Sequence, residues 1–188
     1  MANIKVTLKA VLKDKDGKVV REDVIEPHSL TANMAKLIRV LFGKSDDLVD
    51  RANNTVTVAP SDLATAVIEA AEGETGYGVI VGSGTTSPSP NDYNLASQIS
   101  HGDGDNLLHY YATSVSSVTV NTTSKLEVSR DFKNNGSVDV NINEIGLALN
   151  ITVGGTPHNI LLFRTVLAST YTVTAGSLVT WYVTIELQ

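Results

Sequence analysis

The sequence predicts a mainly β protein, an antiparallel β-sandwich of jelly-roll type with an N-terminal β-hairpin and one or two short helices. Three observations favour this class. The chain has 188 residues, of which 42% are hydrophobic but only 18% are charged, below the roughly 25% of typical soluble proteins. Short alternating runs rich in Val and Thr recur between turn-forming residues. No alternation of strand and helix appears, which argues against a parallel sheet with crossover helices. We expect one domain over residues 1–188.

Residues 4–25 are predicted to form the first hairpin. Two alternating runs flank Asp16-Gly17, and an Asp-Gly pair between such runs is a strong signal for a tight turn. Four apolar residues of the first run are expected to share one face: Val6, Leu8, Ala10 and Leu12.

The clearest helix is predicted after this hairpin. Thr31 is a candidate N-cap and Gly43 a candidate end, with Lys36 and Arg39 expected on the solvent side. The apolar stripe expected against a sheet consists of Leu30, Met34, Leu37, Ile38 and Leu41. Residues 1–45 together are a candidate subdomain or assembly arm.

Residues 54–72 are less regular. "NTVTVAP" predicts a short strand. Residues 61–72 favour a helix capped by Ser61, while a strand through Thr65, Val67 and Glu69 remains the alternative.

Strands dominate from Tyr77 onward. In "DVNINEIGLAL", polar and apolar residues alternate as in a half-buried strand. The alternation breaks at Glu144-Ile145-Gly146, which predicts a β-bulge. Arg130 and Glu144 either pair across neighbouring strands or stand apart as solvated charges. The strand segments are "YGVIVG", "LLHYYATSVSSVTV", "KLEVSRDFKNN", "VDVNINEIGLAL", "HNILLFRTVL" and "LVTWYVTIEL".

The stretch "VGSGTTSPSPNDYNL" at 81–95 opens like a phosphate-binding loop. Such a loop needs backbone N–H donors, a following helix and usually a lysine. Here Gly82 and Gly84 are followed by Pro88 and Pro90 with no lysine nearby, and prolines remove donors. We therefore predict a structural loop.

Two acidic pairs are candidate cation sites. Asp14 and Asp16 flank the hairpin turn and are interpreted as turn residues. Asp103 and Asp105 lie in "HGDGDN", and we expect them as candidate calcium ligands that a neighbouring subunit would complete, because calcium takes six to eight oxygens. No other cofactor is expected.

The sequence does not predict an enzyme. The chain has no cysteine, and it lacks the G-x-S-x-G motif of many serine hydrolases. The histidines are not spaced as in helical zinc sites, although His101 and His109 can meet across a loop. With a net charge of −6 and no basic cluster, nucleic-acid binding is not expected. No apolar run approaches the roughly 20 residues of a membrane helix. The histidines are His28, His101, His109 and His158.

Paired aromatic residues offer another kind of surface. In a strand, Tyr110 and Tyr111 point to opposite sides, as do Trp181 and Tyr182. We expect at least one of each pair in the core. An outward ring suits a sugar platform or a subunit interface.

Several segments in order along the chain resemble a family of structural proteins from tailed bacteriophages and archaeal viruses. "GSGTTSPSPNDYNL" is similar to the family's "GTGTT" and "DDYxL" stretches, and "EPHSLTANMAKLI" to its "HSF" and following helix. "SRDFKNNGSVDVNINEIGLAL" resembles its "RxFxNN" and "EIGL" strands, and "LLFRTVLASTYTVTAGSLVTWYVTI" its closing hairpin. The chain departs from the family at Thr165, where Asp is expected, and at Ala148, where an aromatic is expected.

This resemblance implies a self-assembling virion structural protein: a capsid, decoration, turret or tail component, made in the host cytoplasm. Its partners would be further copies of itself or other virion proteins. The alternative is a non-viral extracellular filament or surface-layer subunit. A second alternative is a carbohydrate-binding module that stacks a glycan on Tyr110 or Trp181.

Overall fold

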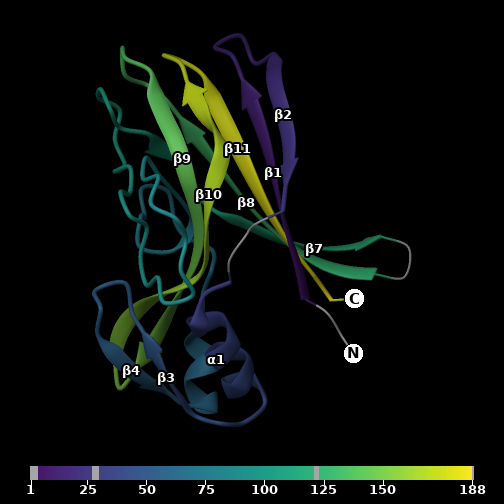
Figure 1. The fold of residues 1–188 in the computed structure, drawn as a ribbon, viewed down its shortest axis with the longest axis vertical. Helices are drawn as coiled ribbons and strands as arrows, with labels where there is room; N and C mark the ends of the chain where they lie inside the picture. The colour runs from purple at the N-terminus through teal and green to yellow at the C-terminus, as the bar shows by residue number, and fades with distance from the viewer. Residues whose placement is uncertain (1–3, 27–29, 121–122, 188) are drawn as a thin grey trace.

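The fold is seen in a computed structural model that describes residues 4–26, 30–120 and 123–187 (Figure 1). It is mainly β, and every sheet is antiparallel, so the predicted fold class is confirmed. Two packed sheets form a sandwich-like body, with a small hairpin and a helix at one end. The jelly-roll connectivity stays a prediction.

The larger sheet has six strands in the order β2-β1-β11-β8-β6, and β7 also pairs with β8. β6 and β7 follow one another along the same edge of β8, at Lys133–Phe132 and at Ser129–Thr123 respectively. The strands are β1 (Ile4–Lys13), β2 (Val19–Ile25), β6 (His109–Tyr110), β7 (Ser114–Val120), β8 (Thr123–Lys133) and β11 (Leu178–Leu187).

The N-terminal hairpin is present as predicted. β1 and β2 turn through Asp14 and Gly17, and Gly17 takes a φ of 81° that favours glycine. The predicted apolar face is buried in full. Because β1 pairs with β11 along its whole length, this hairpin is an integral part of the larger sheet and does not form a separate arm.

The second sheet has the order β10-β9-β5. The strands are β5 (Gly78–Gly82), β9 (Val140–Val153) and β10 (Thr156–Val173). β9 is buried at every position from Glu144 to Leu149, because it is the middle strand and is covered on both faces.

The bulge predicted at Glu144-Ile145-Gly146 is wrong. β9 pairs with β5 without interruption from Glu144 to Ala148. The irregularities lie instead in β10, between Leu161 and Phe163 and between Val166 and Tyr171. The alternation along β9 breaks because both of its faces become buried, and no extra residue is inserted there.

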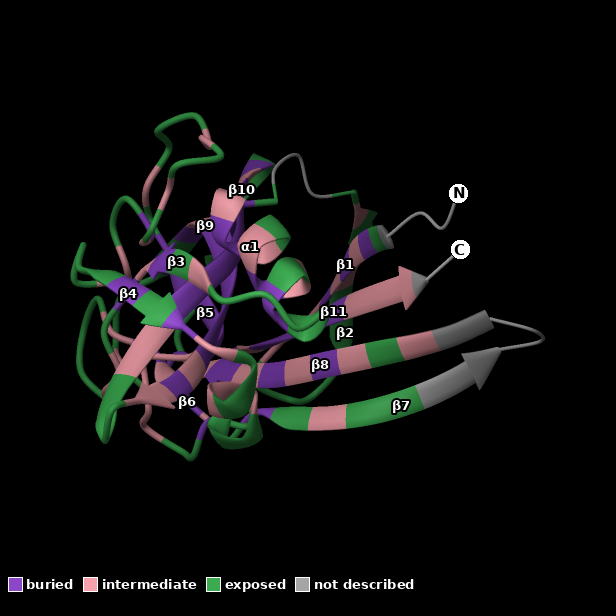
Figure 2. Cartoon of the chain, turned by 90° about the horizontal axis from the view of Figure 1, so that it is seen from below, coloured by how far each residue is buried: buried purple, intermediate pink, exposed green. Residues whose placement is uncertain are grey.

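One hydrophobic core fills the space between the two sheets. Trp181 of β11 packs edge-on against Tyr171 of β10, with ring centroids 4.9 Å apart, and Tyr110 packs edge-on against Phe132. Burial of such a side chain stabilises the fold by roughly 1.5–3 kcal/mol. Figure 2 shows this buried interior along β5, β9 and β10, and it shows mainly exposed and intermediate residues along the described part of β7.

The predicted helix is α1 (Ala32–Leu41), and Gly43 follows its end with a φ of 84°. The predicted apolar stripe is only partly right. The face turned to the body carries Asn33, Leu37 and Val40, whereas Leu41 is 65% exposed. The helix is turned in this way because the Asn33 amide donates to the Val49 carbonyl and accepts from its N–H.

Two further predictions about α1 concern its side-chain contacts, and the one that Thr31 caps the helix is wrong. Thr31 precedes the helix, but its hydroxyl donates to the carbonyls of Leu161 and Leu162 and does not cap the helix. Lys36 is half-buried and donates to the Asp47 carbonyl. Arg39 is exposed as expected and pairs with Asp46 at 2.7 Å.

A small hairpin of β3 (Asp46–Val49) and β4 (Thr55–Val58) follows α1, and Figure 1 shows all three elements at one end of the body.

Residues 61–72 form neither the favoured helix nor the alternative strand. A 3-10 helix, η1 (Pro60–Thr65), is followed by irregular chain with one bridge between Val67 and Asn150. Asp62 rather than Ser61 caps η1, through the Ala59 N–H. No helix in the described ranges has the length and apolarity needed to cross a bilayer.

Candidate functional site

The stretch at 81–95 is organised by a buried ion cluster. Arg164 of β10 donates from Nε to Glu144 at 2.6 Å, from one terminal nitrogen to Asp92 at 2.8 Å, and from the other to the Thr86 carbonyl. Burial lowers the pKa of Arg164, but Asp92 and Glu144 outweigh burial and raise it above its ordinary value. Arg164 therefore stays charged and holds the loop to the sheet.

Glu144 holds the same loop from the other side. It is fully buried and accepts the backbone N–H groups of Gly84, Ala96 and Ser97. The backbone donors of this loop thus point at a carboxylate of the protein itself. The loop is structural, as predicted, and it offers these donors to no phosphate.

The pairing considered for Arg130 and Glu144 is wrong. The two residues lie on β8 and β9, which belong to different sheets. Glu144 pairs with Arg164 on the adjacent strand. Neither residue is a separate solvated charge either, since both are buried.

Arg130 anchors the irregular chain before β5. Its burial lowers the pKa to about 10. Its guanidinium lies 4.9 Å from the centre of the Tyr110 ring. It donates to five backbone carbonyls, those of Ala71, Glu74, Tyr77, Val79 and Tyr111.

Arg51 anchors the neighbouring part of the chain in the same way. It donates to the carbonyls of Thr75 and Gly76 and to the side chains of Asn94 and Gln98. Burial lowers the pKa of Arg51. Three arginines therefore fix the long connection between β4 and β6, which has little regular structure to fix it otherwise.

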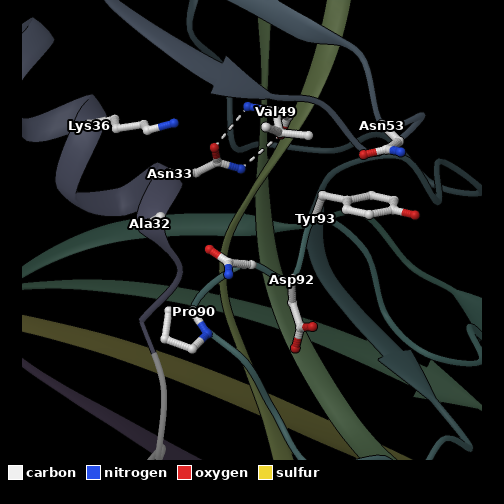
Figure 3. A pocket seen from close by; sticks show the side chains of 9 residues that line it. Ala32, Asn33, Lys36, Val49, Asn53, Pro90, Asp92 and Tyr93 are labelled. Atoms are coloured by element: carbon white, nitrogen blue, oxygen red, sulfur yellow. Dashed lines mark hydrogen bonds between the residues drawn. The ribbon is translucent and has the colours of Figure 1, made fainter.

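A hollow of about 210 Å³ lies between the start of α1, β3 and residues 90–93 (Figure 3). Three of its polar side chains are already engaged by the protein. The Asn33 amide bonds to the N–H and carbonyl of Val49 and also donates to the Leu161 carbonyl, Lys36 donates to the Asp47 carbonyl, and Asp92 binds Arg164. This lining does not form a catalytic constellation.

Asp103 and Asp105, the candidate calcium ligands, both bind protein donors. Asp103 accepts from His109 at 2.8 Å and from Asn135 at 2.7 Å, and Asp105 accepts from the N–H and hydroxyl of Ser137. These hydrogen bonds lower the pKa of each carboxyl. Among the described residues, no group of three or more His, Asp or Glu side chains is arranged to hold a metal ion. Calcium binding stays a prediction.

His101 and His109 do meet, with ring centroids 5.0 Å apart. His109 lies between two carboxylates, with Nδ1 2.8 Å from Asp103 and Nε2 2.8 Å from Glu72. Burial lowers the pKa of His109, but hydrogen bonds to both carboxylates outweigh burial and raise it above 6.5. His158 contacts Asp50, and His28 lies outside the described residues.

The aromatic pairs split as predicted. Tyr110 and Trp181 are fully buried, while Tyr111 and Tyr182 are half-buried. Neither Tyr110 nor Trp181 can therefore stack on a sugar, as the carbohydrate-binding alternative requires.

The strand edges differ in how they are covered. β5 bonds to the segment 97–99 through Val81 and Ser83, and β10 bonds to residues 31 and 51 through Leu162 and Asn159. β6 bonds to Gly73 through the Tyr110 carbonyl. The chain itself thereby covers part of each of these edges.

β7 is different. In the described part of the chain it pairs with β8 alone. Figures 1 and 2 both show the β7–β8 hairpin running out past the body of the molecule. We call this hairpin the arm. Its edge strand is the candidate functional surface.

Comparison of the chain with protein-family models, with curated proteins and with solved structures finds no match. The resemblance to virion structural proteins thus stays a prediction. The sequence predicts one strand over "LLHYYATSVSSVTV", whereas the structure divides this segment into β6 and β7, and the open edge of β7 was not predicted. The overlooked signal in the sequence was that β7, SVSSVTV, carries no charged residue.

Proposed function

We propose that this protein is a self-assembling structural subunit, and that its place is in a virion as a capsid, decoration, turret or tail component. The observation that carries the proposal is the arm, whose seven-residue edge strand β7 is paired on one side only. An open strand edge readily pairs with another chain.

The chemistry of the interior supports a structural role. Extensive polar networks surround Arg164, Arg130 and Arg51. Their hydrogen bonds hold segments without regular secondary structure in place. Their donors and acceptors bind one another, so they do not converge on a space where a substrate would sit. Such networks rigidify a fold, which a subunit of a durable particle needs.

The non-viral filament or surface-layer subunit rests on the same arm and is distinguished by context. Detection of the chain in purified virus particles would favour the virion, and its presence in cell-surface fibres would favour the alternative. The carbohydrate-binding alternative loses its two named rings, because both are buried.

The first test is the mass of the purified protein as a function of concentration, measured by sedimentation and mass photometry, with electron microscopy of the same sample. We expect dimers or larger assemblies whose share rises with concentration. A strict monomer at millimolar concentration, absent from particles of the producing organism or its viruses, would contradict the proposal.

A further inference from the structure

β7 lacks the features that normally protect an exposed strand edge. Natural edges carry charges, prolines or bulges, or are very short. β7 has the sequence SVSSVTV, with no charge and no proline, and it pairs with β8 in one unbroken register from Ser114 to Val120. Such a segment has the composition that favours pairing with another strand.

The other long edge of the same sheet contrasts with β7. β2 carries Arg21, Glu22 and Asp23 in succession. Arg21 donates to the Thr170 carbonyl and the Ser169 hydroxyl on β10, and Asp23 accepts from the Tyr171 hydroxyl. β2 is therefore charged and tied to the second sheet, whereas β7 carries no charge and pairs with β8 alone in the described residues.

We propose that β7 pairs antiparallel with β7 of a second copy, so that two arms form a continuous sheet about a two-fold axis. This inference rests on the proposed function and names its contact. Self-pairing fits β7 because a two-fold contact sets each strand against its own sequence. With no charge on the strand, no like charges face each other.

An apolar groove continues from the root of the arm. It encloses about 430 Å³ and is lined by Ala66, Val67, Ile68, Glu69, Val115 and Leu149. Val67 is 43% exposed and Leu126 on β8 is 37% exposed. Val115 pairs with Val128, and residues two apart share a face, so Leu126 extends the apolar surface of the groove along the arm.

The register of the proposed contact follows from the length of the strand. β7 spans Ser114–Val120, so full overlap of two antiparallel copies places Ser117 opposite itself. The Val120 end of each β7 then lies beside the Ser114 end of the other, next to the groove at the root of that arm. The contact thereby covers the apolar surface that a single copy leaves exposed.

Ser117→Cys tests this register directly, because the chain has no cysteine of its own. Opposite residues of an antiparallel pair have Cα atoms about 4.5–5.5 Å apart, within the roughly 4.4–6.8 Å that a disulfide spans. Ser45→Cys is the matched control, since Ser45 is equally exposed and lies outside the arm. Under mild oxidation we expect Ser117→Cys to form disulfide-linked dimers and Ser45→Cys to remain uncrosslinked.

A charge swap gives a second measurement on the intact fold. Ser117→Lys and Ser117→Glu each place like charges opposite one another and should lose the dimer. An equimolar mixture of the two variants should regain it as a heterodimer. Circular dichroism and melting of each variant would verify that the monomer is folded.

The outcomes separate this contact from the proposed function. If the wild type assembles but Ser117→Cys crosslinks no faster than Ser45→Cys, and neither charge variant dissociates, the β7 contact is wrong and the structural role stands. If Val24→Lys on β2 dissociates the assembly while Ser117→Lys does not, the contact lies on β2. A wild type that stays monomeric overturns the β7 contact, and it overturns the structural role as well when the chain is also absent from virus particles and cell-surface fibres.

Discussion

Buried charge in this protein is arranged around three arginines. One of them, Arg164, pairs with the buried carboxylate of Glu144. Its side chain and that of Glu144 are 3% and 0% exposed. Two charges so placed cost desolvation energy that only close pairing and further hydrogen bonds offset. Here Gly84, Ala96 and Ser97 supply those further bonds to Glu144.

Arg164→Met should destabilise the protein by about 3–5 kcal/mol, because it leaves the Glu144 carboxylate buried without its partner. Denaturant unfolding followed by tryptophan fluorescence measures this loss through the single Trp181. Lys9→Met is the control, since Lys9 and Glu22 form an exposed, solvent-screened pair whose loss should cost far less. Equal losses in the two variants would contradict the assignment of Arg164.

His109 gives the stability a pH dependence. Its pKa is raised above 6.5 in the folded protein, so the protonated ring between Asp103 and Glu72 contributes stability that is fully present below about pH 6.5. The contribution is lost as the pH rises through the folded pKa. The stability difference between wild type and His109→Gln should therefore shrink from pH 6 to pH 9.

Urea midpoints at these two pH values measure that difference. His158→Gln is a useful comparison, since His158 contacts one carboxylate, Asp50, and not two. A wild-type advantage over His109→Gln that grows toward pH 9 would show that the ring is not charged in the folded state.

Among the elements, α1 shows how a buried polar residue can set the orientation of a helix. Asn33 satisfies both backbone groups of Val49, and this contact turns Leu37 and Val40 inward. Leu41 and Phe42 are left outside, with Phe42 83% exposed. The hydrophobic pattern alone does not distinguish these two orientations, since apolar residues occupy both faces.

Leu37→Ala should destabilise the protein by about 2–5 kcal/mol, because it opens a cavity beneath the helix. Leu41→Ala should change stability by no more than about 0.5 kcal/mol, since that side chain is exposed. Thermal and urea unfolding of both variants provide the comparison. A larger loss for Leu41→Ala would restore the stripe expected from helical spacing.

For the molecule as a whole, the distribution of closed and open strand edges is the decisive feature. Irregular segments of the chain bond to part of the edges of β5, β6 and β10, and β2 carries charged residues. β7, on the arm, pairs with β8 alone in the described residues.

Assembly through the arm also predicts how melting depends on concentration. Association that requires the folded state raises the melting temperature as the protein concentration rises. We expect this rise for the wild type over a hundredfold concentration range, measured by scanning calorimetry, and its absence for Ser117→Lys. A rise of equal size in both would place the stabilising contact elsewhere.

Local chemistry sufficed for much of the fold. Asp16-Gly17 specified the first hairpin, alternation specified the buried face of β1, and Gly43 marked the end of α1. The loop at 81–95 was recognised as structural from its prolines and its lack of lysine. These features depend on near neighbours in the chain, so the order of residues determines them.

Contacts between distant residues were decided only by the tertiary structure. Arg164 rather than Arg130 pairs with Glu144, because strand order puts β10 beside β9 and β8 in the other sheet. The meeting of Asp103 with His109 and Asn135 likewise joins two separate loops. The open edge of β7 is also a property of sheet order, since a strand sequence does not state which of its two sides finds a partner.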